Sequence, residues 1–239
     1  MNGYYVCSFP RSGTHLCINT IVDNFGYEWS DLKGTHDWAY YKKMFSQIDN
    51  YNGLVKTHGF YDLLKLLPCK PIIFVIRHPF DVALSFYDYL QRDEFYLWNE
   101  APDIRGMSFE SFINNPFPNW HFDQFTKLER RKDLTLFDYW NAWIVGMLKV
   151  QRKIKSIFIL YEDLNESKID DLTEFLGEWE KEKVIKPDLK NSFSHLPNKG
   201  ISNRFLLEEY KNQLVIMNQN NAGGNALKLY EDIKKHCSN

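Results

Sequence analysis

The chain has 239 residues, of which 44% are hydrophobic and 25% are charged. This hydrophobic fraction supplies enough apolar side chains for a sizeable core, and it excludes a wholly disordered chain. The 29 basic and 31 acidic residues give a net charge of −2. Because general nucleic-acid binding needs a basic bias that this chain lacks, we expect no nucleic-acid partner.

Short apolar segments alternate with helical patterns along the chain. In chain order, the patterns predict a strand at 4–9, a helix at 16–25, strands at 53–57 and 72–76, a helix at 81–90, a helix at 134–153, a strand at 156–161, and helices at 169–176 and 226–235. Five consecutive apolar residues at 72–76 indicate a strand buried on both faces, as in a parallel sheet. This alternation predicts one α/β domain over residues 1–239 with a central parallel sheet.

Residues 91–133 interrupt the alternation, because they are rich in turn-forming and aromatic residues. We interpret them as an insertion over one face of the sheet. The chain has 7 Trp, 14 Tyr and 18 Phe, and 16 of these 39 aromatic residues fall within 86–143. Trp140 and Trp143, at helical spacing, are expected in the core.

Targeting and metal-binding signals are not found. Residues 1–6 lack both the basic and the apolar regions of a signal peptide, and no stretch approaches the ~20 apolar residues of a membrane span. The four cysteines form no Cys-x-x-Cys motif, and no histidine cluster has zinc-ligand spacing. We therefore expect a cytoplasmic protein with reduced thiols, no membrane span and no metal site.

A polar loop, Pro10-Arg11-Ser12-Gly13-Thr14-His15, joins the first predicted strand to the first helix. Backbone N–H groups of such a turn converge on one point, where the helix dipole adds partial positive charge. Gly13 permits close approach, while Arg11, Ser12 and Thr14 supply side-chain donors. The loop predicts an anion site; the alternative is an ordinary turn with Ser or Thr capping the helix. It is not a nucleoside-triphosphate loop, because the first Gly and the Gly-Lys pair are absent.

Basic residues also end two of the predicted strands. Arg77 follows strand 72–76, at the edge where α/β sheets bind ligands. Ser85 lies about two turns into the next helix, so its hydroxyl and the guanidinium of Arg77 could share one phosphate. The alternative is an ion pair between Arg77 and Asp81.

Lys56-Thr57-His58 ends the strand at 53–57. Because side chains alternate along a strand, Lys56 and His58 are expected on the same side, a cation beside a potential base. The alternative for His58 is a purely structural role.

Together these segments resemble the sulfotransferases that use 3′-phosphoadenosine 5′-phosphosulfate (PAPS). Phe9–Thr14 matches the family's Tyr-Pro-Lys-Ser-Gly-Thr loop, which binds the 5′-phosphosulfate, with Arg11 in place of Lys. The family's Arg-x-Pro-x-Asp-x-x-x-Ser element, which holds the 3′-phosphate, is matched by Arg77, Pro79, Asp81 and Ser85. Lys56-Thr57-His58 matches the element that carries the catalytic base, which would be His58.

Two further segments extend the resemblance from residue 4 to about residue 205. Tyr161-Glu162-Asp163-Leu164 matches a segment whose Tyr contacts the adenine. Asn198-Lys199-Gly200 is the best match to an Arg-Lys-Gly stretch that closes over the 3′-phosphate. His15 stands where cytosolic members often have a Trp against the adenine. The fold implied is a three-layer sandwich with a central parallel sheet and a P-loop-like phosphosulfate-binding loop.

The resemblance implies a PAPS-dependent sulfotransferase that transfers a sulfuryl group to a hydroxyl or amine. His58 would be the general base, with Lys56 and Arg11 stabilising charge on the leaving group. No metal is required, because a sulfuryl group carries less charge than a phosphoryl group. The residues expected to bind the nucleotide are Arg11, Ser12, Gly13, Thr14, His15, Arg77, Ser85, Tyr161, Lys199 and Gly200.

The acceptor and the oligomeric state do not follow from the motifs. If residues 91–133 form an acceptor-side lid, its rings favour an apolar or ring-bearing acceptor (a small molecule, a glycan or a lipid); they are Phe95, Tyr96, Trp98, Phe117, Trp120 and Phe122. One alternative is a P-loop kinase or NTPase, whose Mg²⁺ would bind Glu162 and Asp163 after the strand at 156–161. Another is a binding surface at 91–143 on an inactive scaffold.

Overall fold

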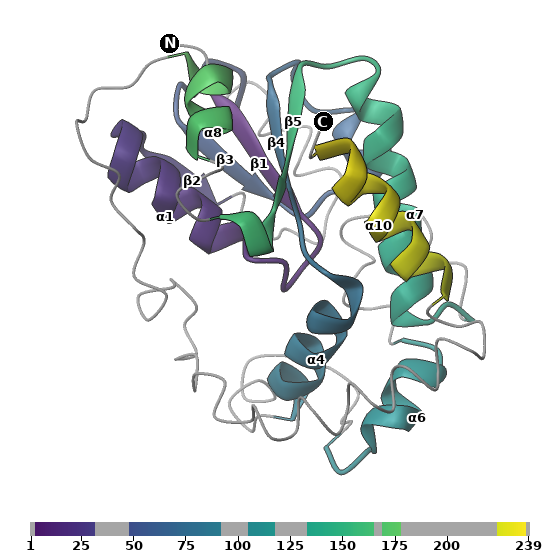
Figure 1. Cartoon of the computed structure of the whole chain (residues 1–239). Coiled ribbons are helices and arrows are strands. Elements are labelled where there is room, and N and C mark those ends of the chain that lie inside the picture. Colours follow the sequence, from purple (N-terminus) through teal and green to yellow (C-terminus); the bar gives the residue numbers. More distant parts are fainter. Residues whose placement is uncertain are drawn as a thin grey trace.

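The computed structural model describes residues 3–31, 48–91, 105–117, 133–164, 169–177 and 224–237. Within these ranges five strands form one sheet of order β2-β3-β1-β4-β5 (Figure 1). The strands are β1 (Tyr4–Ser8), β2 (Trp29–Asp31), β3 (Leu54–Thr57), β4 (Ile72–Ile76) and β5 (Ser156–Leu160). Every neighbouring pair is parallel, which confirms the predicted central parallel sheet.

Helices connect the strands and cover both faces of the sheet. They are α1 (Thr14–Phe25), α3 (Tyr61–Leu64), α4 (Pro79–Leu90), α6 (Phe109–Asn114), α7 (Leu136–Gln151), the 3₁₀ turn η3 (Tyr161–Asp163), α8 (Ile169–Leu176) and α10 (Gly224–Cys237). The predicted helices are confirmed, with ends that differ by at most two residues. Strand β2 and helices α3 and α6 were not predicted, because none exceeds six residues and such short segments show no clear periodicity.

The sheet separates two hydrophobic layers. All residues of β1 and β4 are buried, and successive side chains point to opposite faces. Val6 and Ile73 pack on one face with α1 and α8. Cys7 and Phe74 pack on the other face with α3, α4, α7 and α10. In Figure 1 the carboxyl ends of the strands lie at the lower edge of the sheet, where α4 begins.

Local signals explain where the helices around this edge begin and end. Pro79 is the first residue of α4, a position where its missing N–H costs nothing. Helix α1 ends at Gly26, whose φ of 70° lets its N–H donate to the carbonyl of Val22. Helix α7 starts at a capping box between Thr135 and Asp138.

Many of the aromatic residues form one core beneath α4 and α7. The ring of Phe9 lies 6.0–6.2 Å from those of Phe60, Phe86 and Trp143, and Trp140 and Trp143 are both 1% exposed, as predicted. The assignment of Phe117 to the acceptor-side lid is wrong. Phe117 is 2% exposed, and its ring contacts that of Phe86. The other rings named for that lid lie outside the described residues.

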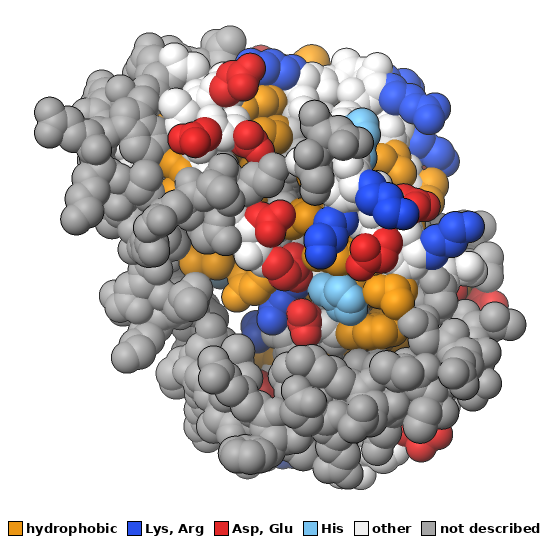
Figure 2. Space-filling view, viewed as in Figure 1, with side chains coloured by type: hydrophobic (Ala, Val, Ile, Leu, Met, Phe, Trp, Pro, Cys, Tyr) orange, Lys and Arg blue, Asp and Glu red, His pale blue; other side chains and the backbone are white. Residues whose placement is uncertain are grey.

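The molecular surface and the helices give two further observations. Figure 2 shows acidic and basic side chains interspersed on the face that carries α8 and α10. No helix in the described part of the chain is long and apolar enough to cross a membrane.

All four cysteines are free thiols, and we expect them to differ sharply in reactivity. Cys7 and Cys17 are fully buried; burial raises the pKa of Cys17 to about 12 and that of Cys7 further, which suppresses the reactive thiolate. Cys69 is exposed. Iodoacetamide should therefore modify Cys69 in the native protein and Cys7 and Cys17 only after denaturation, as measured by peptide mass spectrometry. Equal labelling of Cys7 and Cys69 in the native protein would contradict this packing.

Candidate active site

The loop between β1 and α1 curls around the carboxyl end of the sheet's central strand. Arg11 and Gly13 both adopt left-handed backbone conformations, with φ of 67° and 86°. The N–H of Ser12 donates to the carbonyl of Phe9 at 3.1 Å and closes the turn. Helix α1 starts directly afterwards at Thr14, so the N–H groups of its first turn face the loop. Alternating left- and right-handed residues at a helix start form a concave site for anions.

Position 13 requires a glycine, because the ring of Tyr161 lies close to the backbone there. A Cβ at Gly13 would lie 2.1 Å from Cδ2 of Tyr161, well inside van der Waals contact. Gly13 is also the N-cap of α1, and no side chain caps the helix there. The interpretation of the loop as a Ser- or Thr-capped turn is therefore wrong.

Two buried polar atoms at this loop have no hydrogen-bond partner among the described residues: Oγ of Ser12 and Nε of Arg77. Ser12 is fully buried. Because buried polar groups are almost always hydrogen bonded, such atoms need an explanation. Both are donors, so an anionic group that enters the loop would satisfy them.

Arg77 follows β4 and reaches across to the loop. Its Nη1 donates to the carbonyl oxygen of Arg11 at 3.1 Å, and its guanidinium lies 4.5 Å from the ring centre of Tyr161. In the described residues no ion pair joins Arg77 to Asp81. The guanidinium thus contacts the loop and Tyr161, and the alternative of an ion pair between Arg77 and Asp81 is wrong.

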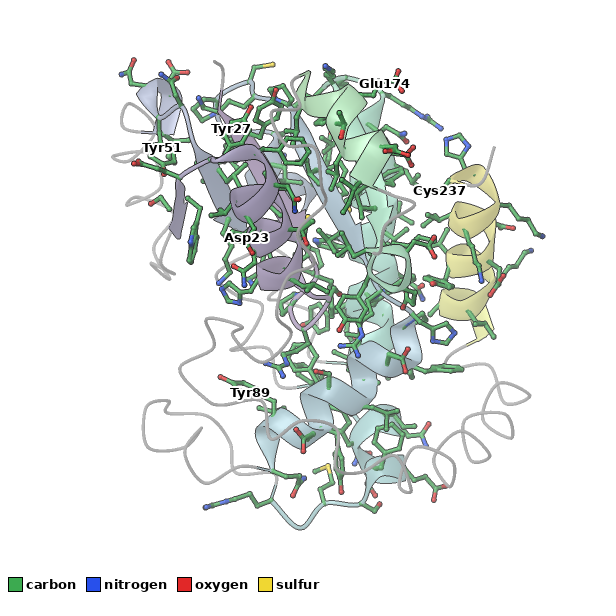
Figure 3. The ribbon with its side chains drawn as sticks, turned by 60° about the vertical axis from the view of Figure 1, so that its left-hand side comes forward. Asp23, Tyr27, Tyr51, Tyr89, Glu174 and Cys237 are labelled. Atoms are coloured by element: carbon green, nitrogen blue, oxygen red, sulfur yellow. The ribbon has the colours of Figure 1, made fainter. Side chains whose placement is uncertain are left out.

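Arg11 extends in turn to α4. Its Nε donates to Oγ of Ser85 at 3.1 Å, and its guanidinium lies 4.7 Å from the ring centre of Tyr89. Ser85 and Tyr89 are four residues apart and share one face of α4; Figure 3 shows Tyr89 projecting from that helix. On sequence grounds Ser85 was expected to share a phosphate with Arg77, and Tyr89 was not identified, although its spacing from Ser85 is visible in the sequence.

His58 lies beside the end of β1, just beyond β3. Its Nδ1 is 2.9 Å from the carbonyl oxygen of Ser8 and 3.4 Å from Oγ of the same residue. Because the carbonyl can only accept, Nδ1 carries a proton in this contact, so in the neutral imidazole the lone pair is on Nε2. Lys56 pairs in register with Val6 of β1 and is half-buried. The strand ends thus bring Lys56 and His58 to the same edge as the loop.

Thr14 and His15, the other predicted loop residues, have partners of their own. Oγ1 of the buried Thr14 contacts Oγ of Ser8. The ring of His15 lies 5.8 Å from that of Trp29 on β2 in an edge-to-face arrangement. Trp29 was not identified from the sequence, because the strand that carries it was not predicted. Lys199 and Gly200 lie outside the described residues.

The segment after β5, η3, is hydrogen bonded to the turn between β4 and α4. The carboxylate of Glu162 accepts the backbone N–H of His78 at 2.8 Å and the hydroxyl of Tyr230 at 3.0 Å. Because Glu162 is committed to these two donors, it is poorly suited to bind Mg²⁺ as the kinase alternative requires. Among the described residues, no group of three or more His, Cys, Asp or Glu side chains is placed to hold a metal.

His78 caps α4 and is neutral in this arrangement. Its Nδ1 accepts the N–H of Phe80 at 3.3 Å, which requires an unprotonated nitrogen. Burial and, to a smaller extent, Lys234 lower the pKa of His78, against the opposing influence of Asp81, Glu162 and Glu231. The imidazole therefore acts here as a cap and a packing surface.

Comparisons with known proteins give one family match and several similar solved structures. The family model of the sulfotransferase domain matches residues 4–221, whereas no curated protein matches the chain. The mouse sulfotransferase SULT7A1 complexed with PAP is similar in structure, with a TM-score of 0.51 and 18% identity over 76% of this chain. This likeness shows the fold. Our chain covers 60% of the SULT7A1 chain.

Two other solved structures have lower TM-scores. A sulfotransferase from Alicyclobacillus acidocaldarius has a TM-score of 0.46 and 15% identity, with 90% of this chain and 92% of that chain covered. Retinol dehydratase in complex with androsterone and the inactive cofactor PAP has a TM-score of 0.46 and 19% identity, with 76% of this chain and 61% of that chain covered.

Proposed function

This chain belongs to the sulfotransferase domain family, and we propose that its site binds PAPS and transfers the sulfuryl group to an acceptor. The observation that carries the proposal is the pair of buried donors, Oγ of Ser12 and Nε of Arg77, that have no partner among the described residues. Ser12 lies in the loop between β1 and α1, which has two left-handed residues, and Arg77 contacts the same loop through the carbonyl oxygen of Arg11. An anionic nucleotide would satisfy both donors.

The residues fit the two ends of such a nucleotide. The amides of residues 13 and 14 and the hydroxyl of Ser12, with Arg11, suit the 5′-phosphosulfate. Arg77 and Ser85 suit the 3′-phosphate, because a guanidinium forms charge-assisted hydrogen bonds with a phosphate and Ser85 has a hydroxyl to donate. Ser85 can accept the Nε–H of Arg11 and still donate its own proton. Tyr161 and His15 are the residues we assign to the adenine, and Lys199 and Gly200 to closure over the 3′-phosphate.

His58 is the proposed general base. Bound PAPS would supply the sulfuryl group that is transferred. The carbonyl of Ser8 holds Nδ1–H, and Nε2 takes the proton from the acceptor hydroxyl or amine, a contribution of about 10²–10⁴ in rate. Arg11 and Lys56 stabilise the negative charge on the leaving 5′-phosphate. No step requires a metal, because these cations supply the positive charge.

The acceptor is proposed to be an apolar or ring-bearing small molecule, glycan or lipid. Support comes from the aromatic residues of the segment 91–133, of which Phe117 is now assigned to the core. We also propose a cytoplasmic location, supported by the four free thiols, since oxidising compartments favour disulfides.

A thermal-shift experiment tests the nucleotide assignment. At about a hundredfold excess over Kd, adenosine 3′,5′-bisphosphate should raise Tm by about 5–10 °C in the presence of EDTA. Adenosine 5′-monophosphate, which lacks the 3′-phosphate that Arg77 and Ser85 bind, should give a smaller shift. A larger shift with magnesium and ATP than with the bisphosphate in EDTA would overturn the proposal in favour of a kinase or NTPase.

A further inference from the structure

We propose that the C-terminal helix α10 is energetically coupled to the nucleotide site, with Tyr230 and Glu162 as positioning residues for Arg77. The inference rests on the proposed function, in which Arg77 binds the 3′-phosphate. It concerns a helix that follows Arg77 by about 150 residues in the chain and that none of the sequence motifs includes. Figures 1 and 3 show the first turn of α10 close to the start of α4, next to the turn after β4.

The first step of the coupling is the link between η3 and the Arg77–His78 peptide. Tyr161 supports the guanidinium of Arg77 at 4.5 Å from its ring centre. Glu162, the next residue, accepts the N–H of His78 at 2.8 Å. Two consecutive residues of η3 thus hold the side chain of Arg77 and the peptide group that follows it. A shift of η3 would move both.

The second step joins η3 to α10. The hydroxyl of Tyr230 donates to the other carboxylate oxygen of Glu162 at 3.0 Å, and its ring lies edge-to-face against His78 at 4.9 Å. Burial and then the charge of Glu162 raise the pKa of Tyr230, so the hydroxyl keeps its proton and remains a donor. Tyr230 of α10 therefore contacts both the carboxylate of Glu162, which holds the turn after β4, and the imidazole of His78 within that turn.

Helix α10 itself is packed against the core, so it can hold the Tyr230 side chain in position. Ala226, Tyr230 and Ile233 recur at helical spacing and are 0–5% exposed, and they join the core shared by α4 and α7. Loss of the Tyr230 hydroxyl would leave this apolar stripe in place. The hydrogen bond can therefore be removed without removing the packing of α10.

Coupling of this kind is reciprocal. If docking of α10 favours the conformation of Arg77 that binds the nucleotide, then bound nucleotide must stabilise the docking of α10 by the same factor. This reciprocity separates coupling from a purely structural role, in which Tyr230 would affect the stability of the fold and not the affinity for the nucleotide.

The variant Tyr230→Phe tests the inference by calorimetric titration with adenosine 3′,5′-bisphosphate. It should bind the bisphosphate about five- to tenfold more weakly than wild type, within the usual range of such couplings. Tyr4→Phe is the matched control, because the Tyr4 hydroxyl donates to the carbonyl of Leu176 at 3.2 Å, at the opposite end of β1. It should bind within about twofold of wild type, since coupling between sites without shared contacts is small. Glu162→Gln keeps one acceptor oxygen and should be intermediate.

Hydrogen exchange gives a second readout, on wild type and on Tyr230→Phe. The bisphosphate should slow amide exchange in residues 224–237, and the slowing should be smaller in Tyr230→Phe. If wild type binds no bisphosphate, the proposed function fails and the inference with it. If wild type binds but exchange in 224–237 is unchanged, or Tyr230→Phe binds as well as Tyr4→Phe, the coupling alone is overturned.

Discussion

His58→Ala is expected to lower the rate of sulfuryl transfer by about 10²–10⁴-fold, the usual contribution of a general base. Affinity for adenosine 3′,5′-bisphosphate should stay within about twofold, because His58 faces the acceptor side of the reaction in the proposal. The measurement is turnover with PAPS and a phenolic or lipid-like acceptor, alongside calorimetric titration with the bisphosphate. Turnover within about threefold of wild type would show that His58 is not the base.

His58→Asn separates the base from its structural contact. The asparagine amide can donate to the carbonyl of Ser8 as Nδ1–H does at 2.9 Å, but it has no nitrogen lone pair that accepts a proton. We expect this variant to match wild type in Tm and to be as inactive as His58→Ala. If His58→Asn retained wild-type turnover, the contribution of His58 would lie in the contact with Ser8.

Gly13→Ala is expected to destabilise the loop and to abolish measurable nucleotide binding. The added Cβ would lie 2.1 Å from Cδ2 of Tyr161, at a φ of 86° that disfavours any side chain. The backbone strain alone costs about 1–3 kcal/mol, and the clash adds to it by displacing the ring that supports Arg77. Chemical denaturation gives the change in unfolding free energy, and bisphosphate titration gives the change in affinity.

Gly26→Ala is the matched control for that variant. Gly26 ends the same helix that Gly13 begins, and it has a φ of 70° with no atom within 4 Å of an added Cβ. It should therefore lose about 1 kcal/mol of stability from backbone strain and keep nucleotide affinity. If the two variants behave alike, the contact between Gly13 and Tyr161 has no role in binding.

The order of the secondary structure and the position of the candidate site were predictable because both depend on local patterns. A five-residue apolar run marks a buried strand, and the carboxyl ends of parallel strands meet at one edge. Arg11, His58 and Arg77 could therefore be assigned to one edge of the sheet before their contacts were known. Short elements such as β2 were missed, since three residues are too few to show a period.

The contacts of the site were less predictable, because they join distant segments. Ser85 was expected to share a phosphate with Arg77, and its hydrogen bond with Arg11 was not foreseen. The acids after β5 resembled possible Mg²⁺ ligands, but Glu162 holds the N–H of His78 and the hydroxyl of Tyr230. Phe117 was expected in an acceptor lid and is a core residue.

The amino-acid sequence by itself determined the parallel α/β architecture, the glycine-containing loop between β1 and α1 and the strand ends that carry Lys56 and Arg77. These features depend on residue patterns within windows of about ten residues. Tertiary structure alone decided which groups meet there: the hydrogen bonds of Arg11 with Ser85, His78 with Glu162 and Glu162 with Tyr230 span 74, 84 and 68 residues. Such partners are selected by how α4, η3 and α10 pack at the end of the sheet, and no local pattern specifies that packing.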